Sequence, residues 1–272
     1  MTTTIEYLLG HSYSERERLL GQAALMDQEA RWLLDRLDVR PGWRAIDVAC
    51  GPLGILPLLA ERVGPAGEVV GLDREPEMLA HAEEMLARRD LHNVRLVHAD
   101  ATATGLPRAG FDLAHVRLLL VNVPNPADVL AELVALVRPG GVVAVQEVDW
   151  ISWQCQPGHP AWDRLRDIMR QAWQAHGLDP FVGRRLPEML RDAGLVDVEA
   201  TAHAGIDPSG HFYQRLLLTF VDRFRPRILD GGFATAAHLE GLTAALRRHL
   251  DDPGTLVVRA LSVQAWGRVP AP

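Results

Sequence analysis

Hydrophobic and polar positions along the chain follow two patterns: short apolar runs, and apolar residues at helical spacing. Nearly continuous apolar runs are typical of strands that are buried on both faces of a sheet. Such runs occupy residues 44–49, 69–73, 94–98, 111–117 and 142–148. Helical patterns lie between most of them, at residues 55–63, 76–89 and 126–138. This order predicts an α/β fold with a parallel sheet and helices on both of its faces.

The segments on either side of this regular region are also predicted to be structured. A helical pattern over residues 19–37 precedes the first strand and ends before Pro41-Gly42. The second half is less regular, and its elements are separated by turn residues such as Gly231-Gly232. It predicts helices at 161–176, 186–194, 212–229 and 235–250, a sixth strand at 196–204 and a last strand at 256–269.

Composition and charge exclude several classes of function. Hydrophobic residues make up 48% of the chain and charged residues 23%, a globular mixture. The net charge of −7 and the lack of a run of basic residues disfavour nucleic acid and anionic membranes as partners. All 28 basic residues are arginine, so a Schiff-base lysine and a P-loop lysine are excluded. No leader or membrane-spanning run is visible, and we expect a cytoplasmic protein.

The stretch from Arg44 to Gly54 is the strongest candidate for a ligand site. It combines a buried strand, a turn containing Gly51 and Gly54, and the start of a helix. Glycine lets a ligand approach the main chain closely, and the backbone N–H groups at a helix start point outward. Dinucleotides and S-adenosylmethionine (SAM) both use such a turn. The turn alone therefore leaves both ligands open.

Of three acidic residues near the predicted site, two favour SAM over NAD. The third, Asp73, does not discriminate: it ends the second strand, where a carboxylate can accept both ribose hydroxyls, and NAD and SAM share this requirement. Asp47 lies just before the turn, where it would repel a pyrophosphate but suits a ligand with an ammonium and a sulfonium. Asp100 ends the third strand and could accept the adenine amino group. An NAD-dependent oxidoreductase remains the alternative enzyme.

Five motifs in order carry a resemblance to a known family. They are Asp47-Val-Ala-Cys-Gly-Pro-Leu-Gly54, Val70-Gly-Leu-Asp73, His98-Ala-Asp100-Ala101, Phe111-Asp112 and Arg138-Pro-Gly-Gly141. Together they resemble the class I SAM-dependent methyltransferases over residues 14–149. Ala49 stands in place of that family's first glycine, and Leu53 where a further glycine is usual, with Gly54 one place later.

The resemblance implies a more specific fold and a division of the chain. The fold would be a Rossmann-like, mostly parallel sheet of seven strands with the last strand antiparallel, plus helical cap insertions. Residues 1–43 would form an N-terminal helical cap, and 44–207 the SAM-binding core, of which 150–180 belongs to the cap. Residues 208–252 would be a helical cap insertion, and 253–272 the final strand of the core.

The residues predicted to bind the cofactor lie mainly at the carboxyl ends of strands, where open α/β sheets bind ligands. Arg117 could meet the SAM carboxylate or pair with a nearby acid, and Gln22 could reach the methionine part or be an exposed helical residue. The full set is Gln22, Asp47, Ala49, Gly51, Asp73, Arg74, Asp100, Ala101 and Arg117.

Candidates for proton transfer are Glu147, His11 and His159, with Asp149 beside them. A base is needed only where an O–H or N–H group of the acceptor must lose its proton. Four tryptophans between Trp150 and Trp173 could be core or could form an apolar wall for a flat substrate. No spacing of His, Cys, Asp and Glu is typical of a metal site, so no metal is predicted.

The sequence thus predicts a SAM-dependent methyltransferase that acts on a small organic acceptor. The segments Tyr7–Ser12, Gly183–Pro187 and Gln264–Arg268 resemble a bacterial small-molecule subgroup, which implies natural-product (secondary) metabolism. We expect no nucleic-acid or membrane partner, and the sequence allows a homodimer. A protein that binds SAM without methyl transfer, and a macromolecular acceptor, remain alternatives.

Overall fold

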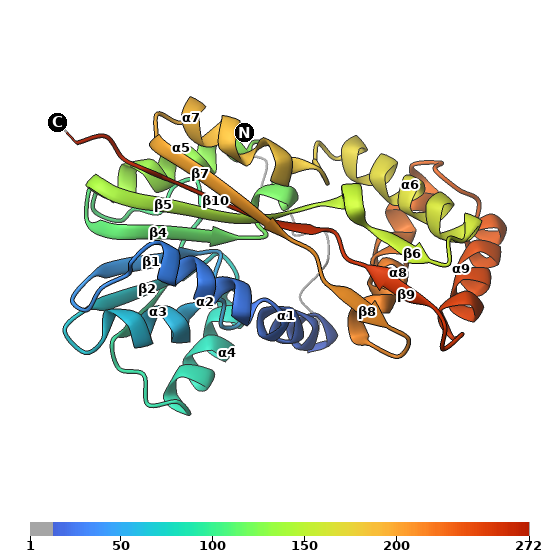
Figure 1. Cartoon of the computed structure of the whole chain (residues 1–272), viewed down its shortest axis with the longest axis horizontal. Helices are drawn as coiled ribbons and strands as arrows, with labels where there is room; N and C mark the ends of the chain where they lie inside the picture. The colour runs from blue at the N-terminus through green and yellow to red at the C-terminus, as the bar shows by residue number, and fades with distance from the viewer. Residues whose placement is uncertain (1–12, 272) are drawn as a thin grey trace.

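A computed structural model of the chain describes the backbone of residues 13–271 and the side chains of residues 18–271. Its centre is a seven-stranded sheet in the order β3-β2-β1-β4-β5-β10-β7 (Figure 1). Neighbouring strands pair in parallel, except that β10 runs antiparallel to both β5 and β7. The strands are β1 (Arg44–Val48), β2 (Glu68–Asp73), β3 (Val94–His98), β4 (Phe111–Arg117), β5 (Val137–Asp149), β7 (Val196–His203) and β10 (Leu261–Arg268). The predicted α/β fold, with its antiparallel last strand, is confirmed.

Helices cover both faces of this sheet, which explains the continuous apolar runs. In β1, Ala45 packs into a core shared with α2, α3 and α4, whereas Ile46 and Val48 pack into a core shared with α5 and α7. Proline in the first turn of α3, α4 and α5 suits the start of a helix, where its missing N–H costs little. These helices are α2 (Asp27–Arg36), α3 (Leu56–Val63), α4 (Pro76–Ala87), α5 (Pro126–Leu136) and α7 (Leu186–Asp192).

A second layer of structure, which we call the cap, lies beyond the carboxyl ends of the parallel strands (Figure 1). It has its own apolar core and a three-stranded sheet in the order β6-β9-β8. Its elements are β6 (Gln154–Gln156), α6 (Pro160–Ala175), β8 (Ile206–Pro208), α8 (Leu216–Asp230), α9 (Ala236–Leu250) and β9 (Leu256–Val258). Helix α1 (Tyr13–Leu25) reaches the cap, where the Arg18 guanidinium lies 5.8 Å from the Phe220 ring. The short helices are η1 (Leu120–Asn122), η2 (Trp150–Ser152), η3 (Val182–Arg185) and η4 (Phe212–Arg215).

The prediction of one last strand at residues 256–269 is wrong. The chain leaves the cap sheet after β9 and enters the main sheet at β10, so one apolar run serves two sheets. Arg259 lies at the break, and its guanidinium binds Asp207 of β8. The helical pattern at residues 19–37 is likewise divided, because Met26 leaves helical geometry between α1 and α2.

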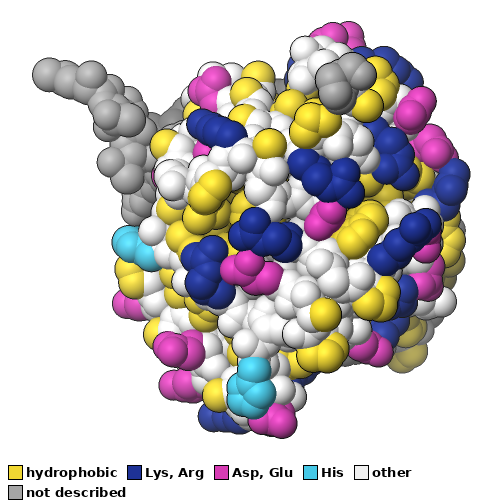
Figure 2. Space-filling view, turned by 90° about the vertical axis from the view of Figure 1, so that its left-hand side faces the viewer, with side chains coloured by type: hydrophobic (Ala, Val, Ile, Leu, Met, Phe, Trp, Pro, Cys, Tyr) yellow, Lys and Arg dark blue, Asp and Glu magenta, His cyan; other side chains and the backbone are white. Residues whose placement is uncertain are grey.

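The face at the amino ends of the parallel strands carries mixed charge (Figure 2). Arginine and acidic side chains alternate there: Arg44 and Arg95 both pair with Glu68, and Arg138 pairs with Asp112. A phosphate backbone needs a continuous positive surface, and this face does not offer one.

A buried ion pair connects β8 to the break between β9 and β10. We expect Asp207→Asn to lower the free energy of unfolding by about 3 kcal/mol, because a fully buried carboxylate that binds Arg259 and His211 loses its charge. Asp222→Asn is the matched control, since the Asp222–Arg247 pair is half exposed and should cost under about 1 kcal/mol. Urea unfolding of both variants measures the difference. Equal losses would contradict a structural role for Asp207.

Candidate active site

A cavity of about 620 Å³ lies between the carboxyl ends of the parallel strands and the cap. The turn after β1, the ends of β2 and β4 and the loop after β3 line one side of it. Helices α1 and α2 and residues of the cap line the rest. Ligands of open α/β sheets bind at this edge, and a volume of several hundred Å³ is typical of small-molecule sites.

The turn after β1 contains three residues in the left-handed backbone region. They are Ala49 (φ 58°), Gly51 (φ 57°) and Gly54 (φ 52°). Alanine in this region costs roughly 1–2 kcal/mol, so Ala49 keeps the backbone path of the family's first glycine at the expense of strain. All three residues line the cavity.

The two glycines of the turn serve different purposes. A Cβ on Gly54 would lie 2.2 Å from Asp47 Oδ2 and 2.8 Å from the Cys50 carbonyl oxygen. A Cβ on Gly51 would meet no protein atom within 4 Å. Gly54 therefore makes room for the Asp47 carboxylate, while Gly51 leaves the main chain open to the cavity. Leu53, where the sequence departs from the family pattern, is buried in the core.

The Asp47 carboxylate is almost fully buried and held on both oxygens. Asp47 Oδ1 lies 2.7 Å from His115 Nδ1, and Oδ2 accepts a hydrogen bond from the Ile55 N–H at 3.2 Å. It still lines the cavity, so its negative charge faces any ligand there. A direct contact with a cationic ligand stays a prediction.

Two further carboxylates lie where the sequence predicts them. Asp73 accepts hydrogen bonds from the N–H groups of Gly51 (2.8 Å) and Glu75 (3.0 Å). Burial raises the pKa of Asp73, and these two bonds oppose the shift. Asp100 Oδ1 accepts from Thr102 Oγ1 (2.6 Å) and Thr102 N (2.8 Å), which lowers the pKa of Asp100. Both carboxylates line the cavity.

The remaining predicted cofactor residues also line the cavity. Arg74 pairs with Glu75 at 3.2 Å, and Ala101 follows Asp100 in the loop after β3. Gln22 of α1 accepts a hydrogen bond from Arg18 at 2.8 Å. The structure thus brings all nine predicted residues to one cavity, and their contacts with a cofactor stay predictions.

Arg117 is the cation at the centre of this lining. Its guanidinium forms no hydrogen bond or salt bridge with the side chains described, and burial lowers its pKa against the opposing charge of Asp47. Arg117 is partly buried, and a cation removed from water without a bonded partner is costly. The sequence left open whether Arg117 pairs with an acid, and among residues 18–271 it does not. It is available for the carboxylate of a ligand.

An aromatic wall lines the other side of the cavity. Trp150 lies 4.9 Å from Trp153 and 5.2 Å from Trp173 between ring centroids, and Phe220 lies within 6.4 Å of all three. These four side chains line the cavity, whereas Trp162 packs in the cap core behind them. Three of the four clustered tryptophans thus belong to the cap core and also line the cavity, and their contact with a substrate stays a prediction.

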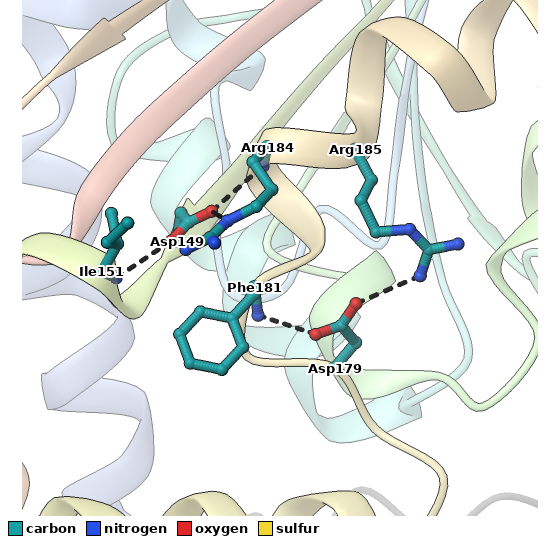
Figure 3. A network of polar contacts seen from close by, with 6 residues as sticks. All are labelled: Asp149, Ile151, Asp179, Phe181, Arg184 and Arg185. Carbon is teal, nitrogen blue, oxygen red and sulfur yellow. Dashed lines mark hydrogen bonds and ion pairs between the residues drawn. The ribbon is translucent and has the colours of Figure 1, made fainter.

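The structure does not bring Glu147, Asp149 or His159 to the cavity. Glu147 lies behind the lining and accepts hydrogen bonds from the N–H groups of Leu120 (2.5 Å) and Val121 (3.4 Å), so it holds the start of η1. His159 caps α6 by accepting from the Ala161 N–H at 3.1 Å. His11 lies outside the described residues. Figure 3 shows why Asp149 is unsuitable: its buried carboxylate binds the Arg184 guanidinium (2.6 Å) and the Ile151 N–H.

Sequence reasoning missed a polar group on the wall opposite the turn. Burial raises the pKa of the Tyr213 phenol, which the charges of Arg18 and Arg259 oppose. The missed lining residues include Arg18, Glu29, His203, Tyr213, Arg259 and Ser262. They come from α1, α2, β7, η4, the break between β9 and β10, and β10 itself, so no local pattern joins them. No group of three or more His, Cys, Asp or Glu in the described part could hold a metal ion.

The cavity offers complementary groups for a ligand of mixed charge. Carboxylates at Asp73 and Asp100 can accept hydrogen bonds from hydroxyl and amino groups, and Arg117 can bind a carboxylate. The open main chain at Gly51 allows close approach. SAM carries all of these partners, so the residues present fit it.

Comparisons with known proteins agree with this geometry. The sequence profile of the family described as methyltransferase domain matches residues 40–193. A demethylmenaquinone methyltransferase of Geobacillus sp. (strain WCH70) is 35% identical over 188 residues, which cover 62% of this chain and 78% of that protein. The fold is similar to a SAM dependent methyltransferase of Aquifex aeolicus (TM-score 0.53, 20% identity, covering 71% of this chain and 91% of the other). It is also similar to a phosphoethanolamine N-methyltransferase of Haemonchus contortus that was solved with S-adenosylhomocysteine (TM-score 0.55, 15% identity, covering 90% and 53%).

These findings define the class of protein: an α/β methyltransferase fold with a cofactor cradle after β1. The chain belongs to the methyltransferase domain family, and it is a SAM-dependent methyltransferase. SAM is therefore the cofactor of this protein, and its binding at the turn after β1 stays a prediction.

The different surroundings of Gly51 and Gly54 generate a paired prediction. We expect Gly51→Ala to cost about 1–2 kcal/mol of unfolding free energy and to weaken S-adenosylhomocysteine binding, because its methyl group points into the cavity. Gly54→Ala should cost about 3 kcal/mol or more, because backbone strain adds to a clash with Asp47. Thermal unfolding and calorimetric titration with S-adenosylhomocysteine measure both. A Gly54→Ala variant that is as stable as the wild type would refute the predicted clash with Asp47.

The position of Glu147 generates a prediction about pH. Burial raises the pKa of Glu147 from 4.5 to about 8, so the folded state holds this proton more tightly than the unfolded state. The contribution of protonated Glu147 to the free energy of unfolding is complete below pH 4.5. It is lost as pH rises to about 8, at up to roughly 1.4 kcal/mol per pH unit. Glu147→Gln, which cannot ionise, should flatten this decline in urea unfolding across the same range.

Glu132→Gln is the matched control for Glu147. Hydrogen bonds from Thr104 and Arg108 outweigh burial and lower the pKa of Glu132, so its contribution is present above the unfolded pKa and lost as pH falls. The two variants should therefore change the pH dependence in opposite directions. An unchanged slope in Glu147→Gln would show that Glu147 is already ionised in the folded protein.

Proposed function

We propose that this methyltransferase acts on a small, planar and largely apolar organic molecule. The observation that carries the proposal is that one cavity joins the cofactor cradle to the aromatic wall of Trp150, Trp153, Trp173 and Phe220. Aromatic side chains contribute large, rigid apolar surfaces that suit a flat ring. A cavity of this size suits a small molecule better than a macromolecule.

The chain's own residues would hold the cofactor and orient the acceptor. SAM supplies an electrophilic methyl group on its sulfonium. We propose that Asp73 accepts hydrogen bonds from the ribose hydroxyls, that Asp100 accepts one from the adenine amino group and that Arg117 binds the carboxylate. We further propose that residues 1–43, 150–180 and 208–252 close over the acceptor. They would exclude water and hold the acceptor in line, which supplies much of the rate of a methyl transfer.

The names of the relatives support a ring-shaped acceptor. The similar Geobacillus protein is named for demethylmenaquinone, which is a quinone. We therefore propose a quinol or related phenol, held between the tryptophans and the cofactor cradle, as the class of acceptor. A place in natural-product metabolism stays a prediction from the sequence.

The setting of the reaction also stays a proposal. No described helix is long and apolar enough to cross a membrane. Mixed charge on the face shown in Figure 2 supports a small-molecule partner in place of nucleic acid. We propose a cytoplasmic location, and a homodimer remains compatible with the sequence.

A screen of acceptors tests the proposed function. We expect transfer of a methyl group from SAM to planar quinols and phenols, and none to aliphatic amines or carboxylic acids of similar size. Mass spectrometry of the products and release of S-adenosylhomocysteine measure the reaction.

Asp73→Ala is the control variant for the screen. It should weaken S-adenosylhomocysteine binding by about 10-fold or more, because two charge-assisted hydrogen bonds are lost. NADH should not bind either protein. Methylation of aliphatic molecules alone would refute the aromatic acceptor.

A further inference from the structure

A row of buried polar side chains crosses the sheet on the face that α2 covers. Arg117 of β4 lies beside Gln146 of β5, and Gln146 lies beside Gln264 of β10. Ser262 precedes Gln264 by two positions and therefore points to the same face. Gln146, Gln264 and Ser262 are at most 8% exposed. Polar groups in such a position require partners.

Glu29 of α2 provides those partners. Its Oε2 accepts hydrogen bonds from Ser262 Oγ (2.5 Å) and Gln146 Nε2 (2.9 Å). Its main-chain oxygen accepts from Gln264 Nε2 at 3.1 Å. These bonds fix the carboxylate against the sheet, and Glu29 lines the cavity. Its second oxygen, Oε1, has no bonded partner among the side chains of residues 18–271.

The arginines nearby leave Glu29 without a salt bridge. Arg259 is engaged by Asp207, and Arg117 forms no salt bridge in the described part of the chain. The negative charge of Glu29 nevertheless acts to raise the pKa of Arg117 and of Arg259. Asp149, by contrast, is neutralised by Arg184. Glu29 is thus a rigid carboxylate on the cavity wall that no arginine neutralises directly.

We propose that Glu29 is the catalytic base, which accepts the hydroxyl proton of an aromatic acceptor. The inference rests on the proposed function, since it requires a phenol or quinol against the aromatic wall. The hydroxyl proton passes to Glu29 Oε1, and the acceptor's electron pair forms the bond to the methyl carbon. The pair of the broken C–S bond stays on sulfur, so the products are the methylated acceptor, S-adenosylhomocysteine and protonated Glu29.

A binding experiment tests this role without turnover. The protein saturated with S-adenosylhomocysteine is titrated by calorimetry with naphthohydroquinone and with its dimethyl ether, which has the same rings and no hydroxyl. The wild type should prefer the diol. Glu29→Gln should bind the diol about 10-fold more weakly and the ether unchanged, because a hydrogen bond to a charged group is lost.

Turnover supplies the second measurement. With naphthohydroquinone as acceptor, Glu29→Gln should lower kcat about 100-fold or more and leave the KM for SAM nearly unchanged. Glu29→Asp should recover part of the rate, since it restores a carboxylate. Glu132→Gln is the matched control: this buried glutamate binds Thr104 and Arg108 away from the cavity, so kcat should not change.

The outcomes separate a catalytic role from a structural one. Glu29 also joins α2 to the sheet, and a purely structural role would lower the unfolding midpoint and S-adenosylhomocysteine affinity with the preference for the diol intact. That result, or an unchanged kcat in Glu29→Gln, overturns the inference. If the wild type binds neither naphthohydroquinone nor its dimethyl ether, both the proposed aromatic acceptor and the role of Glu29 are refuted. Retained binding of S-adenosylhomocysteine in that case leaves the cofactor assignment in place.

Discussion

The burial of one carboxylate, Asp47, determines the geometry of the cofactor cradle. Its oxygens bind His115 of β4 and the N–H of Ile55, the residue just before α3, so one side chain connects two strands and a helix start. Room for that carboxylate exists only because residue 54 has no Cβ. The left-handed backbone at Ala49 and Gly51 then turns the main chain toward the cavity. A buried charge held in this way is costly to disturb, which keeps the turn rigid before any ligand binds.

Polar residues at the carboxyl ends of the parallel strands form one wall of the cavity. Asp73 ends β2 and Arg117 ends β4, while the residues before them pack into the two apolar cores. Because these ends meet at one edge, residues that are far apart in sequence form one wall. The cap supplies the opposite wall from its aromatic core. The cavity is therefore the gap between two layers that each have an apolar core of their own.

Much of the fold follows from local pattern, and most of the second wall does not. The runs at residues 44–49 and 111–117 are apolar on both faces, which predicts buried parallel strands and fixes where their acidic and basic ends lie. The break between β9 and β10 depends on pairing with β6 and β8, which are three-residue strands without periodicity. Glu29 resembles any acid on an amphipathic helix. Its importance arises from Ser262 and Gln146, more than a hundred positions away, and no local signal reports such a contact.

The pairing of charges around the cavity explains how one site can hold a cofactor of mixed charge and an apolar acceptor. Asp149 pairs with Arg184, and Asp207 pairs with Arg259. These ion pairs hold segments of the protein together. Arg117 and Glu29 lack such partners among the side chains described. Interactions between charges are stronger where water is excluded, so the groups that remain unpaired control which ligand groups are accepted. In the roles that we propose, Arg117 would select a carboxylate, Glu29 a proton donor, and the tryptophans the shape of the acceptor.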